Sequence, residues 1–153
     1  MVVVLIIGIL AAVGVPQFTK TVETSRAETA AGITHMIASA IRMMTLDNPG
    51  TIINGTFTNC PTTPPPCNPY AAGTNACNLI ACNYLTNMSF SSMPYEYLAL
   101  NSGSGPRMLA MSYRRVTARY PCKAGKPYCS WTYFCYEDGL CTAQNGAPRV
   151  PSF

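Results

Sequence analysis

The chain has 153 residues and a net charge of +4, and only 10% of its residues are charged, against about 25% in an ordinary soluble domain. We therefore expect much of its surface to be covered by a membrane or by neighbouring copies, and the length suits one modest globular domain plus an appendage. The sequence contains one histidine and 6 scattered acidic residues, and it has no phosphate-binding glycine loop. These residues suggest no catalytic acid–base pair and no nucleophile, so we expect no enzymatic activity, no cofactor and no metal.

The first fifteen residues contain no charge and no polar side chain, and Pro16 follows them. This run is shorter than the ~20 apolar residues of a membrane-spanning helix. It also lacks the basic residues that open a secretory signal. Both shortfalls predict that a few residues precede Met1 in the natural protein. Gly8, Gly14 and Pro16 should weaken a helix at this point.

Beyond Pro16 the apolar residues recur at helical spacing, which predicts one long helix that ends at Asp47-Asn48-Pro49-Gly50. Glu28, His35, Ser39 and Arg42 fall on the opposite face. A helix of this length spans roughly 70 Å, more than the rest of the chain can cover. Its first half must therefore contact lipid or other subunits. The apolar stripe of the second half consists of Val22, Ala30, Ile33, Ile37, Ala40, Ile41 and Met44.

Residues 48–92 are rich in Asn, Thr, Pro and Ser and predict a long loop with a short helical turn at Leu79–Ala81. An even, dense set of cysteines behind an apolar segment indicates disulfides in an oxidising compartment. The rival interpretation, a zinc site, would need C-x2-C spacing, which does not occur. The first four cysteines are expected to pin the loop. The eight are Cys60, Cys67, Cys77, Cys82, Cys122, Cys129, Cys135 and Cys141.

From Pro94 onward the period shifts toward two, which predicts an antiparallel meander of about four strands packed on the Ile33/Ile37/Ile41 stripe. Two turns favour the disulfides Cys135–Cys141 and Cys122–Cys129, and the remaining connectivity stays open. The expected fold class is α+β, divided into a stem (1–28), the amphipathic half of the helix (29–47), the loop (48–92) and the sheet (93–153). The strand candidates are Tyr95–Leu100, Arg107–Tyr113, Arg115–Cys122, Tyr128–Tyr136 and Leu140–Ala143.

The opening block MVVVLIIGILAAVGVPQF, with Ser25-Arg26-Ala27 after it, resembles the N-terminal helix of type IV pilins and type II secretion pseudopilins. The resemblance covers Met1 to about Glu28, and residues 50–153 match only in general architecture. The family's Phe-Thr-Leu-Ile-Glu-like start, with its glutamate, is absent. The chain is therefore expected to begin about six residues inside the mature pattern. Those six residues, added to the fifteen apolar ones present, would restore a full membrane span.

The resemblance implies a precursor cut by a dedicated peptidase and N-methylated, held in the inner membrane, then polymerised by a pilus assembly machinery into an extracellular homo-oligomeric filament. Adhesion, motility and DNA uptake are equally compatible roles. The alternatives are a type II secretion pseudopilin and, from another class, a membrane-anchored periplasmic disulfide-rich binding domain. In family filaments the helix melts around the segment corresponding to Gly8–Pro16. The filament-core residues implied are Val4, Ile7, Gly8, Leu10, Ala11, Gly14, Pro16 and Phe18.

Two charged clusters are candidate sites. Glu23 and Arg26 would form either an ion pair between subunits or a local pair on one helix, and their i,i+3 spacing favours the local pair. The second cluster would bind DNA phosphates or an anionic surface weakly. The competing interpretation, a solvated strand face, is favoured because a net charge of +4 supplies little field. Strand alternation would also send Arg114 and Arg115 to opposite sides. This cluster consists of Arg114, Arg115, Arg119, Lys123 and Lys126.

Overall fold

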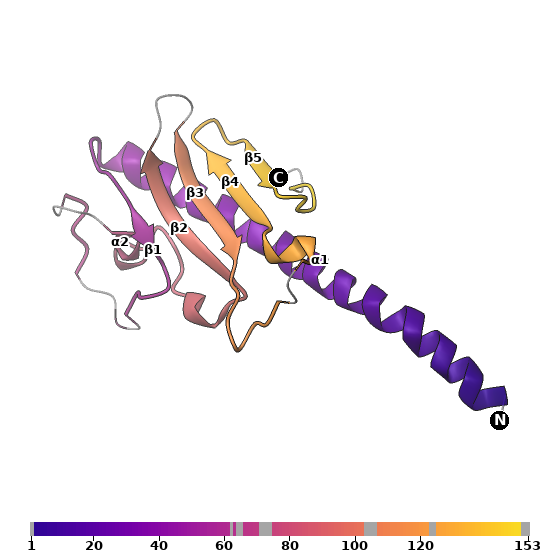
Figure 1. Cartoon of the computed structure of the whole chain (residues 1–153). Coiled ribbons are helices and arrows are strands. Elements are labelled where there is room, and N and C mark those ends of the chain that lie inside the picture. The colour runs from indigo at the N-terminus through magenta and orange to yellow at the C-terminus, as the bar shows by residue number, and fades with distance from the viewer. Residues whose placement is uncertain are drawn as a thin grey trace.

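The protein is a long helix whose C-terminal half lies across one face of an antiparallel sheet, while its N-terminal half projects alone (Figure 1). We call the projecting half the stem and the remainder the head. The helix, α1 (Val2–Asp47), contains 46 residues and continues through Pro16. The computed structural model describes residues 2–61, 63, 66–70, 75–102, 107–122 and 125–150.

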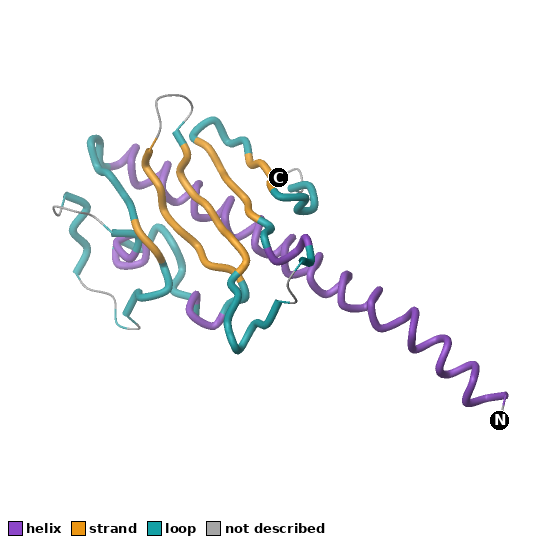
Figure 2. Tube along the Cα trace, in the orientation of Figure 1, coloured by secondary structure: helices purple, strands orange, loops and turns teal. Residues whose placement is uncertain are grey.

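Within the described residues the sheet contains five strands in the order β1-β2-β3-β4-β5, and every neighbouring pair is antiparallel. The strands are drawn orange in Figure 2. Because spatial order equals chain order, the predicted meander is confirmed. A short helix, α2, lies in the loop, and 3₁₀ turns precede β2 and β4. The bounds are β1 Gly55–Thr56, β2 Tyr95–Ser102, β3 Met108–Arg114, β4 Thr132–Tyr136, β5 Cys141–Gln144, α2 Cys77–Ala81, η1 Phe90–Ser92 and η2 Pro127–Cys129.

Most of the predicted apolar stripe of α1 is buried, and the helix packs mainly on β3 and β4. Val22 is only partly buried. Ile33 is only partly buried. Small side chains let the sheet approach the helix closely, so Thr34 reaches Ser112 of β3, with their hydroxyl oxygens 2.6 Å apart. This pair satisfies two hydroxyls inside the core. The fully buried apolar residues on this face of α1 are five members of the predicted stripe, Ala30, Ile37, Ala40, Ile41 and Met44, and three further alanines, Ala27, Ala31 and Ala38.

One predicted strand is wrong and one was missed. Arg115–Cys122 forms no strand, because Thr117 and Tyr120 exchange backbone hydrogen bonds of 3.3 and 3.0 Å and close a tight loop instead. The strand predicted from Tyr128 begins only at Thr132, after the 3₁₀ turn that Pro127 opens. The missed strand is β1, a two-residue piece of the long loop that pairs with β2.

Four disulfides brace the head, and both predicted pairs, Cys122–Cys129 and Cys135–Cys141, are present. The loop is held by Cys60–Cys77 and Cys67–Cys82. It contributes a second part of the core, where the centroid of the Phe90 ring lies 4.9 Å from the centroid of the Phe57 ring and 5.7 Å from that of the Tyr97 ring. The loop is therefore a packed element of the head.

Burial of tyrosine phenols predicts a loss of stability at alkaline pH. Desolvation raises the pKa values of Tyr95 and Tyr97, and with the Glu28 charge it raises the pKa of Tyr133 to about 12. An unfolded tyrosine ionises near pH 10. The stabilisation is therefore complete below pH 10 and is lost as the pH rises toward the folded-state values.

We expect the thermal midpoint of the chain in detergent, followed by circular dichroism, to fall progressively above about pH 10. Tyr133→Phe should flatten this dependence, because it removes one of the buried phenols. Tyr70→Phe is the matched control, since its side chain is 66% exposed. An unchanged midpoint up to about pH 11.5 would contradict the proposed origin.

Candidate functional site: the stem and its junction with the head

The stem exposes a continuous apolar surface. Val4 is 74% exposed and Phe18 is 71% exposed, and the predicted filament-core residues all lie on this half of α1. By length and composition the helix is apolar enough to cross a membrane. Together with four disulfides, which are typical of oxidising compartments, this suggests an extracellular or periplasmic head with a membrane-compatible anchor.

Hydroxyl groups near the base of the stem are satisfied within the helix. Thr19 donates to the carbonyl of Val15 at 3.1 Å, and Thr21 donates to that of Gln17 at 3.1 Å. A polar group that already has a partner costs less to transfer into an apolar environment. The first charged side chain of the helix is Lys20. The part of the stem that precedes Lys20 is therefore suited to being covered by lipid or by protein.

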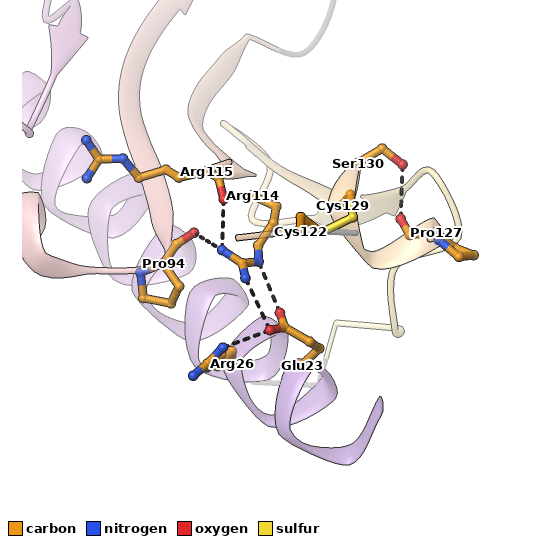
Figure 3. Close-up of a disulfide and its surroundings, with 9 residues drawn as sticks. All are labelled: Glu23, Arg26, Pro94, Arg114, Arg115, Cys122, Pro127, Cys129 and Ser130. Carbon is orange, nitrogen blue, oxygen red and sulfur yellow. Dashed lines mark hydrogen bonds and ion pairs between the residues drawn. A yellow bond between two sulfur atoms is a disulfide. The ribbon is translucent and has the colours of Figure 1, made fainter. Parts of the chain in front are cut away.

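A buried ion cluster joins α1 to the sheet where the stem meets the head (Figure 3). Arg114, at the end of β3, donates from Nε to Glu23 Oε2 at 3.0 Å and from Nη2 to Oε1 at 3.1 Å. Its Nη1 donates to the carbonyls of Pro94 and Arg115 at 3.0 and 2.8 Å. The Arg114 side chain is 1% exposed and that of Glu23 is 7% exposed.

Arg26 supplies a second cation to the same carboxylate. Its Nη1 donates to Glu23 Oε1 at 2.7 Å, one turn along the helix, while 42% of its side chain stays exposed. The local pair that the spacing favoured is thus present within one chain. The sequence did not reveal Arg114 as the principal partner, because 91 residues separate it from Glu23.

The predicted basic cluster does not form one face, and placing Arg114 in it was wrong. A cation that enters the junction needs a carboxylate, so Arg114 lies inside the head against Glu23. Arg115 is mostly buried, 3.8 Å from Glu96, and it donates to the carbonyl of Ser91. Arg119 and Lys126 are exposed, whereas Lys123 lies outside the described residues.

A groove of about 1010 Å³ opens between the stem and the underside of the head. Pro16 and Lys20 line it from the helix, and Pro127, Tyr128 and Trp131 line it from the segment that leads into β4. The Cys122–Cys129 disulfide holds that segment in place. The groove thus combines an apolar lining with the lysine side chains of Lys20 and Lys126.

Within the part of the chain that the structure describes, no group of three or more His, Cys, Asp or Glu side chains is placed to hold a metal ion. His35 lies partly buried on α1.

These features define a class of protein: a disulfide-braced α+β head fixed on a projecting apolar helix. Comparisons of the chain with protein-family models, curated proteins and solved structures found no match.

Proposed function

We propose that this chain is a structural subunit that polymerises through its apolar stem into an extracellular fibre of the type IV pilus kind. Before assembly the stem would hold the subunit in the inner membrane. The observation that carries the proposal is an exposed apolar helix that continues directly into a disulfide-braced head. The Met1–Glu28 block, which resembles the pilin helix, adds support from the sequence.

The free energy of covering the stem would drive association. Burying one large aliphatic or aromatic side chain contributes about 1.5–3 kcal/mol, and the stem exposes a whole series of them. Lipid can cover these side chains around a single copy, and other stems can cover them in a filament. The exposed series on the stem includes Val3, Val4, Ile6, Ile7, Ile9, Leu10, Val13, Val15 and Phe18.

The junction favours a fibre subunit over a flexible tether. A tethered binding domain would benefit from a mobile linker, whereas α1 enters the head as one uninterrupted helix. The Glu23–Arg114 pair then fixes the sheet to that helix at the point of entry. A rigid stem and head would carry axial load from subunit to subunit.

Substitution of a stem glycine distinguishes a filament from a monomeric anchor. A Cβ added at Gly14 meets no atom within 4 Å, so Gly14→Leu should leave the single subunit folded and membrane-bound. Small residues allow close helix–helix packing, so the variant should reduce fibres sheared from the producing cells by roughly tenfold or more. Val13→Leu is the matched control, because Val13 is already large and is 60% exposed.

An antibody against the head measures the amount of the protein in the sheared fraction and in the membrane fraction. Electron microscopy then shows whether the sheared fraction contains fibres. The proposal expects wild-type fibres that the antibody decorates. If the wild-type chain remains a membrane-bound monomer and forms no fibres, the proposed function is wrong.

A further inference from the structure

The groove beneath the head is suited to an apolar group with acidic neighbours. Trp131 is 6% exposed, and its side chain lines the groove with those of Pro16 and Tyr128. Lys20 and Lys126 lie on opposite walls, one on α1 and one beside η2. Among the residues that the structure describes, neither lysine lies within salt-bridge distance of a carboxylate. The groove therefore presents two unneutralised cations around an apolar floor.

The opposite end of the head carries the complementary chemistry. The turn between β4 and β5, residues 137–140, lies at the end of the sheet remote from the stem (Figure 1). Leu140 is 59% exposed, and the side chain of Glu137 is 57% exposed. Asp138 is also exposed, and its carboxylate accepts the Leu140 N–H at 2.9 Å. An apolar side chain thus stands beside two acids.

This turn is preorganised for a contact. Gly139 adopts a φ of +92°, which favours glycine, and the Cys135–Cys141 disulfide joins the two strands at its base. Arg107 approaches Glu137 only to 4.0 Å, and both side chains are largely exposed, so this pair contributes little. Order at the turn means that little conformational entropy is lost on binding.

We propose that the β4–β5 turn of one copy docks into the groove of the next copy, with Leu140 on the apolar lining and Asp138 opposite Lys126. The inference rests on the proposed function and names the contact between heads within the fibre. The two surfaces lie at opposite ends of one head, so the contact is heterologous, and copies joined end to end form an open row and not a ring. It therefore extends indefinitely along one direction.

The dimensions of α1 agree with such a contact. The β4–β5 turn lies beside Arg42, whose Nη2 donates to the carbonyl of Tyr136 at 3.3 Å. Arg42 is 22 residues after Lys20, which corresponds to about 33 Å along the helix. Copies related by this contact would repeat at roughly that distance along a row. The head of the lower copy would then lie beside the stem of the upper copy. The same arrangement brings Leu140 up alongside Val15 and Pro16, which line the groove from the stem side.

A charge exchange tests the contact in fibres assembled from the full chain. Asp138→Lys and Lys126→Glu should each reduce the yield of sheared fibres by roughly tenfold or more, because each places like charges together. The double variant restores opposite charges and should recover the yield to within about threefold of the wild type. Arg119→Glu is the matched control, since Arg119 is exposed but does not line the groove, and it should assemble normally.

Membrane-fraction levels and non-reducing electrophoresis show whether each variant is made and forms its four disulfides. If wild-type fibres form and both single variants assemble normally, the head contact is wrong while the proposed function stands. If both single variants fail and the double variant is not restored, the Asp138–Lys126 pairing is wrong. Absence of fibres from the wild type overturns the proposed function itself.

Discussion

Glu23→Ala is expected to lower the free energy of unfolding by about 3–5 kcal/mol, which is the cost of leaving a buried charge without its partner. The stranded group would be Arg114, whose side chain is 1% exposed and whose Nε and Nη2 both donate to Glu23. The remaining acceptors, the carbonyls of Pro94 and Arg115, cannot neutralise its charge. The sheet should therefore detach from α1 at the junction before the rest of the head unfolds.

Two variants separate the buried pair from its exposed neighbour. Arg26→Ala should cost no more than about 1 kcal/mol, because Arg26 is largely in solvent and Glu23 keeps its main partner. The double variant Glu23→Leu/Arg114→Met should be less destabilised than Glu23→Ala, since it removes both charges and keeps the volume filled.

Denaturant unfolding of the full chain in detergent provides the measurement. The fluorescence of Trp131 reports on the head, since it is the only tryptophan. If Glu23→Ala unfolds at the same denaturant concentration as Arg26→Ala, the cluster does not hold the stem to the head.

Removing the two loop disulfides should have the second large effect. Cys60–Cys77 and Cys67–Cys82 close segments of 17 and 15 residues. A disulfide that closes a loop of this size stabilises the folded protein by about 3 kcal/mol. Without them the loop would gain much conformational entropy when it leaves the sheet. It would also withdraw Phe57 and Phe90 from the core, where both are buried.

The comparison uses paired Cys→Ala substitutions, so that no unpaired thiol remains. Each loop pair should lower the thermal midpoint by roughly 10 °C or more in a head of this size. Removal of Cys122–Cys129, which closes only 7 residues, should lower it less, because a shorter loop restricts the unfolded chain less. Equal shifts for all three pairs would contradict this account of the loop.

The local patterns of the sequence predicted much of this fold. The 3.6-residue stripe identified the buried face of α1, and the helix ends within the predicted stop segment, at Asp47. The two disulfides across turns were predictable because their cysteines are close in sequence. Contacts between segments that are distant in the sequence were not predictable. Glu23, for example, binds Arg114, which lies 91 residues further along the chain.

Two errors have different physical causes. Arg115–Cys122 alternates like a strand, but its hydrogen bonds are satisfied by its own loop. Residues Gly55–Thr56 have no strand pattern, yet they pair with β2 because the disulfide-held loop brings them to that edge. In the first case a local turn replaced the strand, and in the second tertiary context outweighed local preference. The groove, likewise, exists only because the stem and the η2 segment meet in space.

The strands at the two borders of the sheet limit how copies can associate. β1 offers two residues and β5 offers four, and β5 is tied to β4 by Cys135–Cys141. Exposed strand borders are templates for uncontrolled pairing with other chains, and short ones suppress it. Copies of this chain that come together are thereby protected from amyloid-like pairing through the sheet, so side-chain surfaces would have to provide any ordered association.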